Sequence, residues 1–137
     1  MCRYLATSLT ILLASAHAMA DEKKAPAVRA IDVKVDGEVT NRFGSPVVVA
    51  DGDQLAKAIK DEAAVAAVKK AVDFEKEQVV YFAWSGSGQD KLTFAAAGEQ
   101  KGPDVIFTYT PGRTRDVRMH KKLFALPKEA KFKVVGP

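Results

Sequence analysis

Two polar segments of the chain carry side chains that could bind or transform a ligand. The first follows an apolar run and contains Trp84, Ser85, Ser87, Gln89 and Asp90. Its two glycines would expose backbone amides, and amides beside hydroxyl and carboxamide groups can hold an anion or a peptide backbone. The same composition is ordinary turn chemistry between two strands, with the tryptophan in the core. The loop is therefore a candidate binding site with a purely structural alternative.

The second segment is basic and spans residues 113–122, with five cations and one anion. Strand alternation would place Arg118, His120 and Lys122 on one face and Lys121 on the other. Such a row could bind phosphate, sulfate or carboxylate polymers, and the alternative is a solvated edge strand. No aromatic residues interleave with the cations, so binding of nucleic acid is not expected. The candidate binding residues here are Arg113, Arg115, Arg118, His120 and Lys122.

A serine–histidine–aspartate triad is the main enzymatic alternative. Ser85 or Ser87 with His120 and Asp90 could form one, but the sequence spacing does not show that they meet. Cations around His120 would lower its basicity. The glycine loop lacks both the Walker A spacing and the nucleophile-elbow pattern, and no EF-hand or cysteine–histidine cluster is present. We therefore expect no catalytic residues, no metal and no cofactor.

The N-terminal segment has the features of a secretory signal peptide. A positive start precedes an apolar run from Leu5 to Ala16, which is too short for a membrane helix. Small residues stand at the required positions before two possible cuts, one before Met19 and one before Asp21. We expect a signal peptide over residues 1–20, a secreted or periplasmic protein, and no transmembrane segment after cleavage.

The chain after the predicted cut divides into a disordered leader over residues 21–30 and one domain over residues 31–137. The one cysteine, Cys2, lies in the predicted signal peptide, so packing and not a disulfide must stabilise the domain. The net charge of +4 is unevenly distributed: residues 21–112 are net acidic, and residues 113–137 are strongly basic. An uneven charge distribution points to a charged partner.

Periodicity predicts an α+β domain. Residues 54–72 have the apolar spacing of one helix, or of two short helices broken near Asp61. Alternating patterns predict strands before and after it, at residues 31–35, 47–49, 79–84, 92–96, 105–109, 114–126 and 132–134. We expect the helix to pack on a mostly antiparallel sheet that ends in a β-meander.

The central strand should contribute Val80, Phe82 and Trp84 to one face. We expect this face to pack on the helix through its apolar stripe, which contains Leu55, Ile59 and Val68.

The segments at residues 72–74, 84–88, 110–115 and 123–128 resemble a class of small secreted bacterial proteins of unknown function. This resemblance covers most of the domain and implies no activity. The polar loop at residues 85–90 and the basic segment at residues 113–122 favour a secreted non-enzymatic binding or accessory module whose partner is an extracytoplasmic protein or an anionic polymer. A polyanion-binding envelope protein that uses only residues 113–122 is the second hypothesis, and a small hydrolase is the third.

We predict that the exported protein begins at Asp21, with Met19 as the second choice, because Ala18 and Ala20 precede that cut. Mass spectrometry of the exported protein gives its N-terminal residue directly. An exported species that retains Met1 would contradict both the signal peptide and the assigned compartment.

Overall fold

The computed structural model describes residues 27–39, 42–97 and 104–137. The predicted signal peptide and residues 21–26 of the predicted leader lie outside the described residues. The elements are β1 (Arg29–Ile31), β2 (Val47–Val49), α1 (Gly52–Ala58), α2 (Glu62–Ala71), β3 (Glu77–Ser87), β4 (Lys91–Ala96), β5 (Val105–Thr110), β6 (Val117–Pro127) and β7 (Phe132–Val135). The protein is mainly β with two helices, an α+β domain in outline.

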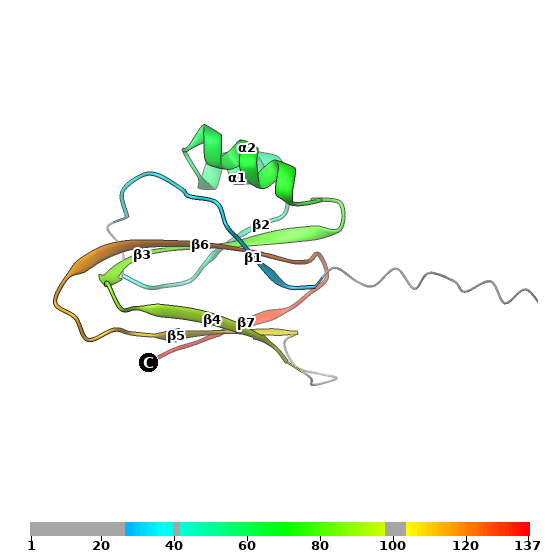
Figure 1. The fold of residues 1–137 in the computed structure, drawn as a ribbon. Coiled ribbons are helices and arrows are strands. Elements are labelled where there is room, and N and C mark those ends of the chain that lie inside the picture. The colour runs from blue at the N-terminus through cyan, green and yellow to red at the C-terminus, as the bar shows by residue number, and fades with distance from the viewer. Residues whose placement is uncertain (1–26, 40–41, 98–103) are drawn as a thin grey trace, which may run out of the picture.

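The elements form three layers (Figure 1). The two helices cover one face of a four-stranded sheet of order β1-β6-β3-β2. A three-stranded sheet of order β4-β5-β7 covers the other face. All strand pairs are antiparallel except β5 and β7, which are parallel.

The predicted single sheet ending in a meander is wrong. β3 does not pair with β4 but with β6, from Glu77 opposite Pro127 to Ser87 opposite Val117. After β3 the chain crosses to the second sheet, forms β4 and β5 there, and returns along β3 as β6. Alternation identified these strands correctly, but it carries no information about which distant strand pairs with which.

The helical region is two helices, with the break at Asp61 where the sequence allowed it. Asp51 caps α1 by accepting from the amides of Asp53 and Gln54. Asp61 caps α2 by accepting from the amide of Ala64 at 3.1 Å. Each cap provides a hydrogen-bond acceptor for amides at the start of the helix that have no partner within the helix.

The predicted contact between the aromatic face of β3 and the helices is also wrong. Val80, Phe82 and Trp84 are buried between the two sheets, among residues of β5 and β6 such as Phe107. The opposite face of β3 packs on the helices instead, through Val79 and Tyr81. The apolar stripe of the helices is buried there as expected: Leu55, Ile59, Val65, Val68 and Val72.

The predicted disordered leader is two residues too long, because Arg29 and Ala30 belong to β1. Arg29 lies opposite Ala125 of β6, and its guanidinium forms an ion pair with Glu77 at 2.5 Å. Glu77 is 5% exposed and also accepts from the amide of Asp73. Because one buried carboxylate joins β1, β3 and the turn after α2, this pair anchors the start of the domain.

We expect Phe82→Ala to reduce the free energy of unfolding by about 3–5 kcal/mol, because a ring filling the space between two sheets leaves a cavity. Chemical denaturation monitored by circular dichroism measures this. Val117→Ala is the control, since Val117 is 78% exposed, and it should change stability by less than about 0.5 kcal/mol. Equal effects of the two changes would contradict the assignment of Phe82 to a core.

Candidate functional site

The two polar segments singled out by the sequence meet at one end of the molecule. The turn from β3 to β4 and the loop from β5 to β6 lie there side by side (Figure 1). The turn contains residues 88–90, and the loop contains residues 111–116. This end of the molecule, hereafter the loop end, is the candidate site.

Asp90 holds the loop end together. Its Oδ2 accepts from Nε1 of Trp84 at 3.0 Å and from the hydroxyl of Tyr109 at 2.9 Å. Its Oδ1 accepts from the amide of Gly112 at 2.7 Å. One carboxylate therefore joins β3, β5 and the loop that follows β5.

The ionised form of Asp90 is favoured by these donors. Burial by itself would raise the pKa of Asp90, but the Gly112 amide, the Trp84 and Tyr109 side chains and nearby His120 outweigh it, so the pKa is lowered. The pKa of Tyr109 is raised, first by burial and then by its bond to this carboxylate. Both shifts keep the phenol as donor and the carboxylate as acceptor at neutral pH.

A second set of hydrogen bonds joins the two segments through Ser87. Its hydroxyl is 2.5 Å from the hydroxyl of Thr114 and accepts from the amides of Thr114 and Gln89. Asp116 accepts from the amide of Gly88 at 3.3 Å and from Nε of Arg118 at 2.8 Å. The pKa of Asp116 is lowered, and the largest cause is a hydrogen bond between Asp116 and the side chain of Thr114.

Glycine in the turn and loop serves close packing. A Cβ at Gly86 would overlap the carboxylate of Asp90, and a Cβ at Gly112 would overlap the hydroxyl of Ser87 and the backbone of Gln89. The amides of Gly88 and Gly112 are bonded to carboxylates within the protein. Of the two glycines considered from the sequence, Gly88 therefore has its amide bonded to the protein's own Asp116, and Gly86 lies in β3 opposite Arg118.

Among the described residues, no hydrogen bond joins His120 to the hydroxyl of Ser85 or Ser87. The ring of His120 stacks on Trp84 with centroids 4.8 Å apart, and its Nε2 is 2.8 Å from the carbonyl oxygen of Ser87. A carbonyl can only accept, so Nε2 carries the hydrogen. Ser85 lies on the opposite face of β3 from Trp84, because alternate residues face opposite ways. The described residues also contain no group of three His, Cys, Asp or Glu side chains that could hold a metal ion.

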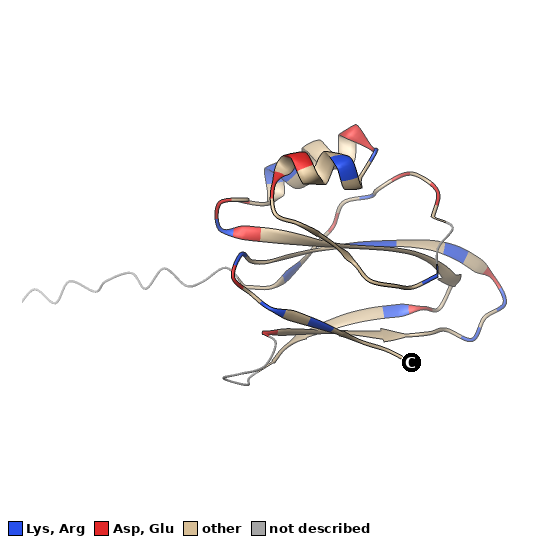
Figure 2. Ribbon diagram, turned by 180° about the vertical axis from the view of Figure 1, so that it is seen from behind, with Lys and Arg blue, Asp and Glu red and all other residues tan. Residues whose placement is uncertain are grey.

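The basic segment is only partly a strand. β6 begins at Val117 and not at Thr114, so Arg113 and Arg115 lie in the preceding loop. Asp116 is paired with Arg118, and acidic and basic residues are interspersed along the ribbon (Figure 2). On β6 itself the predicted alternation is correct: Arg118, His120 and Lys122 lie opposite Gly86, Trp84 and Phe82 of β3.

Lys121 lies on the other face of β6 and has a structural role. Its Nζ donates to the carbonyl oxygen of Val35 at 2.9 Å and also to that of Gly37. These bonds hold the segment after β1 against the sheet. Two of the three donors of the Lys121 ammonium group are therefore used within the protein.

An open hollow of about 530 Å³ lies between the turn and the loop. Two cations, Lys91 and Arg113, line it, and neither has an ion-pair partner in the parts of the chain that the structure describes. The remaining lining residues are Gly88, Gln89, Asp90, Thr110, Pro111 and Gly112. The hollow has the size and charge to receive an anionic group, such as a carboxylate or sulfate.

The candidates from the sequence did not include Lys91, Tyr109, Thr114 or Asp116, whose side chains lie at the loop end. Tyr109 and Lys91 appear in the sequence as ordinary alternating strand residues, and Thr114 as part of a basic run. A signal for Tyr109 is its place beside the turn Pro111-Gly112, where an aromatic ring can be buried while its hydroxyl reaches a polar partner.

Comparisons with protein-family models, with curated proteins and with solved structures find no match to this chain. The resemblance to small secreted bacterial proteins remains a prediction. No helix within residues 27–39, 42–97 and 104–137 is long and apolar enough to cross a membrane.

We predict that Asp90→Asn reduces the free energy of unfolding at neutral pH by about 1–3 kcal/mol, because an amide cannot accept on both of its polar atoms. A lowered pKa means that ionised Asp90 stabilises the fold above the ordinary aspartate value of 3.8. This stabilisation is lost as the pH falls through the lower value of the folded state. The difference between wild type and variant should therefore shrink in acid.

Chemical denaturation over a series of pH values measures that difference. Glu129→Gln is the matched control, because Glu129 is exposed and should change stability little at any pH. A gap between wild type and Asp90→Asn that stays constant with pH would contradict the role given to the ionised carboxylate.

Proposed function

We propose that this protein is a secreted or periplasmic, non-catalytic binding domain that holds an anionic group of its partner in the hollow at the loop end. The observation that carries this proposal is the pair of cations, Lys91 and Arg113, that line an open hollow without an ion-pair partner among the described residues. An unpaired cation at the mouth of a hollow favours a negatively charged ligand.

The acidic groups beside the hollow support this assignment. Asp90 is bonded by three donors, and Asp116 is bonded by Gly88 and Arg118. Their charges are therefore stabilised within the protein, and neither carboxylate forms an ion pair with Lys91 or Arg113, although Asp90 also lines the hollow. The rigid hydrogen-bond network also fixes both loops, which lowers the entropic cost of binding.

Binding along the basic strand alone is the second hypothesis and has weaker support. Arg118 is paired with Asp116, and Lys121 binds backbone carbonyls on the other face of the sheet. Lys122 is exposed and remains the strand cation free to contact a polymer. A partner on the strand would therefore depend on Lys122 more than on Lys91.

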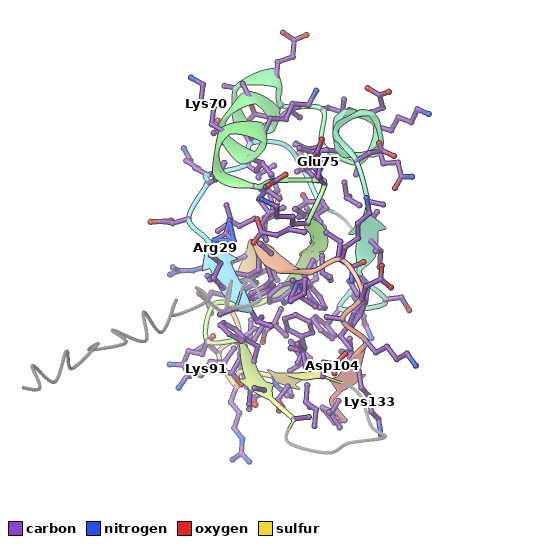
Figure 3. All side chains as sticks on the ribbon, turned by 90° about the vertical axis from the view of Figure 1, so that its right-hand side faces the viewer. Arg29, Lys70, Glu75, Lys91, Asp104 and Lys133 are labelled. Carbon is purple, nitrogen blue, oxygen red and sulfur yellow. The ribbon has the colours of Figure 1, made fainter. Side chains whose placement is uncertain are left out.

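The proposal predicts that Lys91→Ala and Arg113→Ala each elute from a sulfated polysaccharide column at lower salt than wild type. Each lost contact should reduce the slope of log affinity against log salt by about one. Lys70→Ala and Lys133→Ala are matched controls, since they remove the same charge from α2 and β7, away from the hollow (Figure 3).

The site is supported if both control variants elute at the same salt concentration as wild type and both hollow variants elute at a lower salt concentration. Equal shifts in all four variants would mean that only net charge matters. A wild-type protein that fails to bind at low salt would also contradict the proposal. A loss confined to Lys122→Ala would move the site to the strand.

A further inference from the structure

The outer edge of β6 is unpaired over about half of its length. β3 pairs with all of β6, but on the other side β1 pairs only with Leu123, Phe124 and Ala125. Residues 117–122 therefore have no strand on this side within the described chain. No hydrogen bond outside the sheet ladders uses their backbone groups there either. Such an edge presents free amides and carbonyls to any extended chain.

The chain after β1 does not pair with this edge, although it passes close to it: the amide of Val39 donates to Sδ of Met119 at 3.3 Å. The amide of Asp36 donates to Asp61 at the start of α2, at 2.9 Å, and Val35 is buried against the helices. Nζ of Lys121 donates to the carbonyl oxygens of Val35 and Gly37. An open groove of about 410 Å³ remains between this segment and β6, lined by Val33, Lys34, Val35, Asp36, Gly37, Met119 and Lys121.

The side chains along the open edge alternate in character. Val117 and Met119 are apolar and are 78% and 54% exposed on one face. Arg118 and Lys122 are cations exposed on the other face, with His120 between them, and Arg118 is also ion-paired with Asp116 in the preceding loop. Directly opposite residues on neighbouring strands interact, so an added strand gains most when it places apolar residues on the first face and acidic residues on the second.

The protein's own sequence has most of this pattern next to β1. If the register of β1 on β6 continued, Asp32 would lie opposite Lys122, Val35 opposite Met119 and Asp36 opposite Arg118, and only Lys34, opposite His120, would depart from it. In the structure this segment does not pair with residues 117–122 of β6. Its sequence nevertheless shows the kind of strand, with acidic and apolar residues in alternation, that would complement the side chains of this edge. A second copy of β6 does not fit, because two such strands would set cations against cations.

We propose that the open edge of β6, residues 117–122, binds an extended segment of a partner protein in which acidic and apolar residues alternate. The segment adds a strand to the four-stranded sheet. Its backbone supplies the hydrogen bonds and its alternating side chains supply the specificity. This inference goes beyond the anion site in the hollow and depends on different residues.

The test uses a labelled peptide of alternating valine and glutamate, about eight residues long, which is enough to span the open edge. Fluorescence anisotropy should show binding to the wild-type protein. A proline–glutamate repeat of the same charge should bind at least about tenfold more weakly, because proline lacks the amide that a ladder needs. A valine–lysine repeat should not bind.

Charge reversal on the protein makes the test specific. The double variant R118E/K122E should lose the valine–glutamate peptide by at least about tenfold and gain the valine–lysine peptide. The matched control K70E/K133E should bind like wild type. Lys91→Ala should also bind the peptide like wild type, which separates this edge from the hollow.

Equal binding of the proline and valine peptides would overturn the inference, because it would show attraction by charge alone. Absence of binding by the valine–glutamate peptide, or binding unaffected by charge reversal, would overturn it as well. Circular dichroism of each variant establishes that it is folded, and M119K is a second variant that should weaken binding through the apolar face.

Discussion

The pairing of β3 with β6 is the constraint on which the rest of the structure depends. β3 is apolar on both faces, and both faces are covered, one by the helices and one by the second sheet. Leu123 and Ala125 of β6 join the helical side, and Phe124 and Leu126 join the side between the sheets. The same two strands are therefore the common wall of two hydrophobic cores, and neither core can form without them.

This arrangement also determines where the candidate site lies. Because β3 and β6 each connect to the second sheet at the same end, their two connections must lie side by side. Asp90 uses that proximity: it accepts from Trp84 on β3, Tyr109 on β5 and Gly112 in the loop. A rigid loop end follows from the topology, and the hollow with Lys91 and Arg113 lies between its two connections.

The edge of β6 is open because the strand beside it, β1, is much shorter. β1 and β2 are three residues long, whereas β3 and β6 are 11 residues long. Short edge strands cannot cover long central ones, and the remaining edge of β6 carries cations, which discourage pairing with further copies of the same strand. The same cations would attract an acidic strand. They therefore disfavour pairing between copies of this protein and favour binding of an acidic partner.

Most local features of this fold were predictable from sequence, although only Ile31 of the strand predicted at residues 31–35 belongs to a strand. The pairing of the strands was not predictable. Asp61 marked the break between the helices because a side-chain cap acts within a few residues. Phe82 was assigned to the wrong core because β3 is apolar on both faces, so its pattern does not say which face the helices cover. The sequence indicated Trp84 and Asp90 as binding residues, but the structure gives them an internal hydrogen bond, which only the return of β6 and the position of Tyr109 make understandable.

Amide hydrogen exchange tests the central role of the β3–β6 pair most directly. We expect the slowest-exchanging amides to belong to the ladder of Val79–Tyr81 with Leu123–Ala125, and to exchange only through global unfolding. Amides of the helices and of β4, β5 and β7 should exchange no more slowly than these. Protection in the second sheet or in the helices that outlasts the β3–β6 ladder would contradict the account, because it would show that a layer remains folded without the common wall.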